Sequence, residues 1–159
     1  MQWESINSIT GQREYVLWHH DKKALTLTFH PSTNSARVES PREKRVFLIR
    51  NEGFLRNRTV MRTEYGILLG QLRFENKENF IEINNEKFFY IVRNNLLPEV
   101  VIYKESKEDP FTVCSLNIDA AHFTKNKNLP ASLESGLLLS LCWYLMLPAV
   151  KEKTPKMAV

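Results

Sequence analysis

The uncharged segment near the C-terminus constrains the fold more than any other part of the chain. No Asp, Glu, Lys or Arg occurs from residue 135 to residue 150, and residues 136–147 show no polar face when drawn as a helix. A helix that is apolar all round must be buried, either in protein or in lipid. The rest of the chain must therefore either enclose this helix or leave it to a membrane.

Helix-start and helix-stop signals flank the segment. Pro130 suits a first helical turn, Ser132 can cap the helix, and Glu134 carries a negative charge where a helix N-terminus favours one. Pro148 predicts the end of the helix, because proline lacks the amide hydrogen that the next turn needs. Residues 135–150 would rise about 24 Å as a helix, whereas a bilayer core is about 30 Å thick. The length favours burial in protein, with a tail anchor formed by residues 135–150 as the alternative.

Short strand-forming segments separated by turn residues fill the chain before the helix. Residues 23–29 alternate between large apolar and smaller side chains, which is the pattern of a half-buried strand. Asparagine-rich turns at residues 76–79 and 84–87 predict hairpins, since asparagine tolerates left-handed backbone angles. Strands that recur about every 8 to 12 residues are typical of an antiparallel sandwich or barrel. The further predicted strands are residues 14–20, 44–50, 58–64, 68–75, 80–83, 87–92, 100–103 and 111–116.

These elements predict one mainly β domain. A chain of 159 residues, of which 43% are hydrophobic and 25% charged, is long and apolar enough for a single core. We expect an antiparallel β-barrel of about ten to twelve strands with the C-terminal hydrophobic helix buried along its axis, because a closed sheet of that size has room for one helix. This domain is expected to cover residues 1–150, and residues 151–159 are expected to form a charged, disordered tail.

The order of these elements resembles a known architecture. The stretch Tyr65-Gly66-Ile67-Leu68-Leu69-Gly70-Gln71-Leu72, the hairpin from Phe80 to Val92 and the helix from Leu137 to Pro148 resemble the tubby C-terminal-like group over residues 14–148. That group includes tubby proteins, phospholipid scramblases and plant LURP-one-related proteins. The resemblance implies a barrel of roughly twelve strands around a central hydrophobic helix. The tubby branch binds phosphoinositides through basic residues, but its pocket motif does not align here, so no binding residue is transferred.

Basic residues gather between residues 42 and 62. Seven Lys or Arg and two Glu give this segment a charge of +5, and the rest of the chain sums to −1. Such a segment can meet an anionic partner, and a solvated strand edge is the alternative. The expected partner is an anionic phospholipid or another protein. Nucleic acid is disfavoured, because no nucleic-acid-binding module accompanies the charge. The candidate anion-binding residues are Arg42, Lys44, Arg45, Arg56 and Arg58.

Motifs for catalysis, metal binding and cofactor binding are missing from the sequence. His19 and His20 are adjacent, and neighbouring strand residues point to opposite faces, so the pair is not suited to one metal ion. Cys114 and Cys142 lie in a predicted strand and in the apolar helix, where a thiol behaves as a small hydrophobic group. No HExxH, CxxC, GxSxG, P-loop or GxGxxG sequence occurs. We therefore predict no catalytic residue, no metal and no cofactor.

The sequence favours a non-catalytic binding or scaffold protein that meets anionic lipid headgroups at a membrane surface. One alternative is a carrier or enzyme with an apolar pocket inside the barrel, and another is the tail-anchored protein described above. The N-terminal residues lack the basic and apolar regions of a secretory signal, and two cysteines are too few for a disulfide scaffold. We therefore expect a cytoplasmic protein that is peripheral at the membrane.

Overall fold

The computed structural model describes residues 2–6, 12–54, 58–94, 98–104, 108, 110–115, 122–123 and 132–153. They form a mainly β structure, in which one antiparallel sheet is accompanied by a C-terminal helix, α1 (Leu133–Lys153). The strands are β1 (Gln2–Ile6), β2 (Arg13–His19), β3 (Lys22–His30), β4 (Ser35–Ser40), β5 (Arg45–Glu52), β6 (Arg58–Thr63), β7 (Leu68–Glu75), β8 (Glu78–Ile83), β9 (Glu86–Asn94), β10 (Pro98–Tyr103), β11 (Thr112–Ser115) and β12 (His122–Phe123).

The sheet follows the order of the sequence. Each strand from β1 to β10 pairs with the next strand along the chain, and the short β12 pairs with β1. All of these pairs are antiparallel. No backbone pairing within the described residues joins β11 to β12, so the sheet is open between these two strands. The prediction of a mainly β, antiparallel fold with one C-terminal helix is confirmed.

Two-residue turns connect several of the strands. Both central residues have positive φ angles in the β2–β3 turn (His20 and Asp21), in the β7–β8 turn (Asn76 and Lys77) and in the β8–β9 turn (Asn84 and Asn85). Turns of this kind match the right-handed twist of the strands that they join. The asparagine turns predicted at residues 76–79 and 84–87 are therefore present. Each is shorter than predicted, because β8 already begins at Glu78 and β9 already begins at Glu86.

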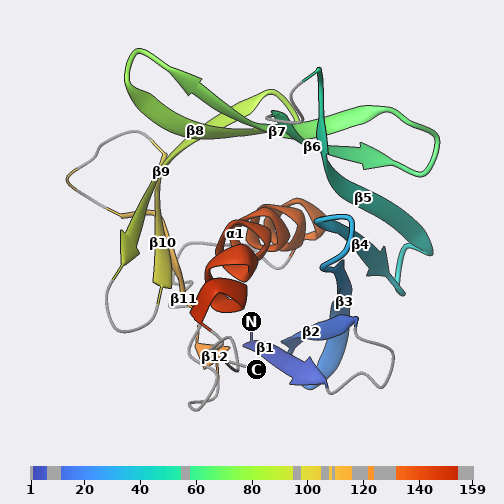
Figure 1. The fold of residues 1–159 in the computed structure, drawn as a ribbon. Coiled ribbons are helices and arrows are strands. Elements are labelled where there is room, and N and C mark those ends of the chain that lie inside the picture. The colour runs from blue at the N-terminus through green and yellow to red at the C-terminus, as the bar shows by residue number, and fades with distance from the viewer. Residues whose placement is uncertain are drawn as a thin grey trace, which may run out of the picture.

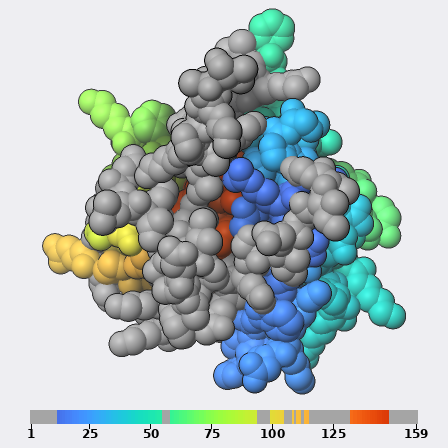
Figure 2. Space-filling model, turned by 60° about the horizontal axis from the view of Figure 1, so that its bottom comes forward, coloured from blue at the N-terminus to red at the C-terminus, as the bar shows by residue number. Residues whose placement is uncertain are grey.

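Helix α1 lies inside the curve of the sheet (Figure 1). It contacts β3 and β4 on one side and β10 and β11 on the other, and Leu139, Leu141 and Cys142 are completely buried. The alternating strand predicted at residues 23–29 supplies Leu25 and Leu27 to the same core. Figure 2 views the molecule from the side on which β12 lies, and atoms of α1, in orange-red, are visible there beside the blue N-terminal strands. The apolar helix is thus buried by protein.

Hydrogen bonds near the start and in the middle of α1 show its direction along the sheet. Near its start, the Asn84 amide in the β8–β9 turn donates to the Glu134 carboxylate at 3.0 Å. Three turns later, the Tyr144 hydroxyl donates to the carbonyl oxygen of Asn34, in the β3–β4 turn, at 2.6 Å. In an antiparallel sheet these two turns lie at opposite ends of the strands. The helix therefore runs from one end of the sheet to the other.

The start of α1 lies where the sequence predicts it, whereas its end does not. The Ser132 hydroxyl accepts a hydrogen bond from the Ser135 amide at 3.2 Å, which is the predicted cap. The prediction that Pro148 ends the helix is wrong, because α1 continues to Lys153. Proline removes one helical hydrogen bond, but burial of the preceding turn, including Leu147, already holds the chain in place. Residues 151–153 are helical, and the rest of the predicted disordered tail lies outside the described residues.

Within the part of the chain that the structure describes, no helix combines the length and the apolar character that crossing a bilayer requires.

The packing of α1 predicts a large effect from a single truncation. Leu141→Ala removes a side chain with 0% exposure from the interface with the sheet, and we expect it to lower the free energy of unfolding by about 2–5 kcal/mol. Leu68→Ala, at a position that is 39% exposed, is the matched control and is expected to change stability much less. Urea unfolding followed by circular dichroism measures both. Equal effects of the two substitutions would contradict burial of α1.

Candidate functional site

The turns at one end of the sheet surround the start of α1. Because successive strands are antiparallel, the β2–β3, β4–β5, β6–β7 and β8–β9 turns lie at the same end. Glu134 of α1 is bonded to the β8–β9 turn, so the helix begins at this end. We call it the proximal end and the opposite one, which contains the β3–β4, β5–β6 and β7–β8 connections, the distal end.

The predicted anion-binding residues divide between the two ends. Arg42 and Lys44 lie in the β4–β5 turn, and Arg45 is the first residue of β5, so these three belong to the proximal end. Arg58 pairs with Glu52 at the other end of β5. Seven residues separate Arg45 from Glu52, which corresponds to roughly 24 Å of strand. The five residues therefore do not form one surface, and Arg56 lies outside the described residues.

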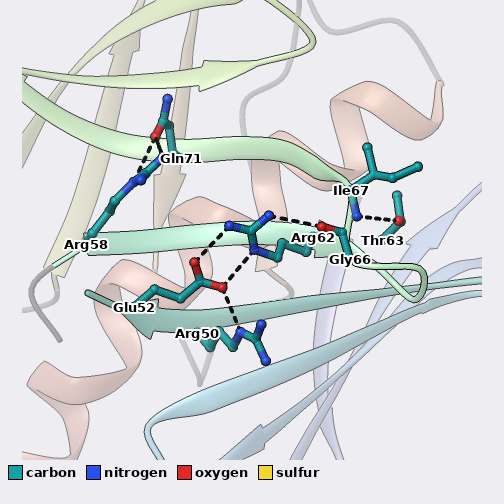
Figure 3. A network of polar contacts seen from close by, with 8 residues as sticks. All are labelled: Arg50, Glu52, Arg58, Arg62, Thr63, Gly66, Ile67 and Gln71. Atoms are coloured by element: carbon teal, nitrogen blue, oxygen red, sulfur yellow. Dashed lines mark hydrogen bonds and ion pairs between the residues drawn. The ribbon is translucent and has the colours of Figure 1, made fainter. Parts of the chain in front are cut away.

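Arg58, at the distal end, belongs to a polar network on β5, β6 and β7, in which Arg62 lies next to the β6–β7 turn (Figure 3). Arg58 donates two hydrogen bonds to the Gln71 side-chain oxygen, at 3.1 and 2.7 Å. Arg62 donates to both carboxylate oxygens of Glu52, at 2.7 and 2.9 Å, and Arg50 donates to the same carboxylate at 2.9 Å. These guanidinium groups already form hydrogen bonds or ion pairs within the protein. Their charges are therefore less available to a ligand than those of basic side chains without such partners.

The network also changes the acidity of its central carboxylate. Hydrogen bonds from Arg62 and Arg50, together with their positive charges, lower the pKa of Glu52 to about 2 from its ordinary value of 4.5. Glu52 is therefore ionised at neutral and mildly acidic pH. Its ion pairs with Arg62 and Arg50 link β5 to β6, and no described contact gives it a proton to exchange.

Five basic residues gather at the proximal end. In addition to Arg42, Lys44 and Arg45, the β2–β3 hairpin supplies Lys22 and Lys23 at the start of β3. Within the described residues Lys22, Lys23, Arg42 and Lys44 have no ion pair, whereas the Arg45 guanidinium lies 4.9 Å from the Phe47 ring centre. We call these five residues the proximal basic cluster. Sequence reasoning missed the two lysines because they lie outside the basic segment, although the turn formed by His20 and Asp21 precedes them directly.

A cavity of about 580 Å³ opens within this cluster. It lies between the β2–β3 hairpin, the β4–β5 turn and the first turn of α1. A β-bulge shapes its wall, because Leu17 pairs with Leu25 but Trp18 pairs with Lys23, which leaves Ala24 without a partner in β2. The cavity is lined by His19, Lys22, Lys23, Ala24, Leu25, Ser40, Pro41, Arg42, Glu43, Ser132, Leu133 and Gly136.

Close contact between α1 and β3 closes the inner side of this cavity. A Cβ atom added to Gly136 would lie 2.6 Å from the Leu25 side chain, a distance at which one of them must move. Glycine at this position therefore lets the first turn of α1 rest directly on β3. The inner wall is apolar, and the basic side chains lie toward solvent.

Exposed apolar side chains lie beside the basic cluster in the β6–β7 turn. Tyr65 is 84% exposed and Ile67 is 62% exposed. The turn is ordered by hydrogen bonds, since the Thr63 amide donates to the Ile67 carbonyl at 2.9 Å and the Thr63 hydroxyl accepts from the Ile67 amide at 3.2 Å. The Glu64 amide also donates to the Val46 carbonyl, next to Arg45, at 3.2 Å. Apolar and basic groups are thus held side by side.

The remaining candidates for chemistry are isolated or buried. The His19 and His20 rings lie 4.2 Å apart, and burial lowers the pKa of His19. Cys114 and Cys142 are buried free thiols, and burial raises the pKa of Cys114. Among the residues whose placement the structure describes, no three His, Cys, Asp or Glu side chains come together as metal ligands. These residues give no arrangement of nucleophile and base.

Comparison of the chain with protein-family models, with curated proteins and with solved structures gives no match. Function is therefore inferred from the residues at the proximal end.

The Glu52 network predicts a pH-dependent effect on stability. Because its pKa is lowered in the folded state, the Glu52 ion pairs stabilise the protein above a pH of about 4.5, and this contribution is lost as the pH falls toward 2. Glu52→Gln is expected to lower the urea midpoint at pH 7, and the difference from the parent protein should shrink steadily below pH 4.5.

Glu39→Gln, which breaks the exposed ion pair with Arg37, is the control. It should change the urea midpoint little, both at pH 7 and below pH 4.5. A Glu52→Gln difference that stays the same from pH 7 to pH 3 would show that the ion pairs do not stabilise the fold.

Proposed function

We propose that this protein is a non-catalytic binding protein whose proximal end docks on an anionic membrane surface. The observation that carries the proposal is the combination of basic side chains that have no ion pair within the described residues with an exposed Tyr65 and Ile67, all at one end of the sheet. Basic residues are attracted to anionic headgroups, and exposed aromatic and aliphatic side chains enter the interface between headgroups and acyl chains.

The energetics of the proximal end suit a reversible membrane contact. A basic residue near an anionic surface contributes about 1 kcal/mol, which falls as salt screens the charge. The acidic residues on the same turns, Asp21, Glu43 and Glu64, reduce the net positive charge of this end. A weak electrostatic attraction supplemented by two apolar side chains therefore supports peripheral binding that is sensitive to salt.

The location of α1 favours this proposal over a tail anchor. The alternative requires residues 135–150 to leave the sheet and enter lipid, which would expose the core that Leu139, Leu141 and Cys142 now fill. Docking through the proximal turns leaves this core intact. The protein then meets the membrane as a folded unit.

The proposal includes closure of the sheet into a barrel of the tubby C-terminal-like kind. Contacts of α1 with β3 and β4 as well as with β10 and β11 support it, because strands near both ends of the sheet then flank the same helix. Closure would join β11 to β12, and it would bury the remaining backbone groups of those two edges. A closed barrel would hold the proximal turns as a rigid ring around the start of α1.

Charge reversal in the β4–β5 turn tests the electrostatic part of the proposal. Lys44→Glu is expected to weaken binding to phosphatidylcholine vesicles that contain phosphatidylglycerol by about fivefold or more, since about 1 kcal/mol is lost before repulsion is added. Lys77→Glu is a matched control, because Lys77 is also an exposed turn residue with positive φ but lies at the distal end. Co-sedimentation at low and at physiological salt measures both. Equal loss of binding in the two variants would sink the idea of a specific docking end.

A second variant tests the apolar part. Tyr65→Ser/Ile67→Ser removes two exposed side chains and is expected to weaken vesicle binding about tenfold without lowering the melting temperature. Phe54→Ser, at a fully exposed position after β5 on the distal side, is the control and should bind as the parent does. Tryptophan fluorescence and vesicle co-sedimentation give the two readouts. Unchanged binding of the double variant would remove the β6–β7 turn from the docking surface.

A further inference from the structure

We propose that the cavity at the proximal end binds an amphipathic organic anion, that is, a molecule with one phosphate or carboxylate group on a short apolar body. The proposal rests on the proposed function in that both assign an anionic partner to the same basic cluster. It goes further by naming the class of ligand and the place where each part of the ligand lies.

The dimensions and the inner wall of the cavity suit such a ligand. Its volume of about 580 Å³ falls within the range of about 300–1,000 Å³ that is typical of small-molecule sites. The inner wall reaches the core, since Leu25 is 2% exposed and Gly136 is buried, and Leu133 and Ala24 continue this wall outward. An apolar body of a few carbons placed here would be removed from water, which is favourable by about 0.8 kcal/mol per CH₂ group.

The outer part of the cavity suits an anionic group. Lys22, Lys23 and Arg42 supply three cationic side chains, and the described residues offer none of them an ion pair. The acidic residue of the lining, Glu43, already accepts a hydrogen bond from the Ser40 hydroxyl. Hydrogen bonds between cationic donors and a phosphate or carboxylate are about twice as strong as neutral ones. The charge of the lining therefore selects an anion over a cation.

The β-bulge in β3 contributes to this arrangement. Strict alternation from Leu25 would place Ala24 on the opposite face from Lys23. The bulge leaves Ala24 without a partner and changes the strand direction there, and both Ala24 and Lys23 line the cavity. Bulges occur frequently beside binding sites, where they redirect a side chain. In this protein the bulge brings an apolar wall residue and a cationic residue into one site.

A second pocket on the other side of the start of α1 provides an internal comparison. It has a volume of about 170 Å³, and its charged lining residues are Glu86, Glu134 and Lys104. Two carboxylates and one ammonium group repel an anion, and this pocket has less than a third of the volume of the first cavity. The same end of the sheet therefore presents one site for an amphipathic anion and one that rejects it.

Hexyl phosphate is the probe that tests the proposal, because it dissolves without vesicles. The full chain is expected to bind hexyl phosphate saturably, with at least tenfold weaker binding of inorganic phosphate and no binding of hexylammonium. Isothermal titration calorimetry measures the affinities. Absence of saturable hexyl phosphate binding, or equal binding of hexylammonium, would overturn the proposal.

Three variants locate the site, and the first two have opposite expectations. Ala24→Trp fills the cavity and is expected to abolish hexyl phosphate binding while vesicle binding stays within twofold. Tyr65→Ser/Ile67→Ser is expected to weaken vesicle binding and to leave hexyl phosphate binding unchanged. Arg42→Gln, on an exposed turn where folding is not at risk, should raise the dissociation constant for hexyl phosphate at least tenfold. Parent-like hexyl phosphate binding by both Arg42→Gln and a folded Ala24→Trp would place the ligand elsewhere and overturn the assignment.

The same variants separate this proposal from the proposed function and distinguish two sources of the ligand. If the parent protein binds hexyl phosphate but not vesicles, membrane docking alone is refuted. If it binds vesicles but not hexyl phosphate, the cavity site alone is refuted. If the ligand comes from a membrane, vesicles with lysophosphatidic acid should bind more tightly than phosphatidylglycerol vesicles of equal charge, and Ala24→Trp should remove that difference. If it is a free metabolite, hexyl phosphate should bind while the two kinds of vesicle bind equally.

Discussion

The rest of the structure depends on the burial of a helix that has no polar face. Leu139 and Leu141 lie toward different sides of α1, and both are completely enclosed. An ordinary amphipathic helix covers one face of a sheet, whereas this one needs apolar contacts all round. A sheet that follows the sequence order and curves progressively can supply them, because its inner side chains approach the helix from several directions (Figure 1). The helix and the curvature of the sheet therefore stabilise each other.

This arrangement leaves the two ends of the sheet and its outer face for other roles. On the outer face, Arg50, Glu52 and Arg62 join neighbouring strands through ion pairs, and their charges are largely neutralised locally. At the proximal end, Arg42 lies in a turn and Lys22 begins β3 directly after the β2–β3 turn, and the described residues offer neither side chain an ion pair. Among the described residues, these cationic groups without an ion pair lie where the regular pairing of the sheet stops, and that is where we place the binding surface and its cavity.

The candidate site shows why nearness in sequence was a poor guide to nearness in space. Arg45 and Arg58 belong to one basic segment, but a full strand separates them and sends them to opposite ends of the sheet. Lys23 and Arg42 are further apart in sequence, yet the two turns that carry them meet at one cavity. Antiparallel strands bring alternate turns together, so residues about two strands apart become neighbours. Without strand lengths and turn positions, this pairing of turns was not predictable.

The sequence by itself determined the apolar helix, its start at Ser132, the alternating strand at residues 23–29 and the antiparallel class of the sheet, because hydrophobic periodicity and turn residues act over a few neighbouring positions. Only the tertiary structure decided that α1 continues through Pro148, that the basic segment divides between two ends and that Ala24 lies at a bulge beside a cavity. These features depend on which strand lies beside which and on how burial outweighs local preference. Such contacts join residues far apart in the chain, and no local pattern records them.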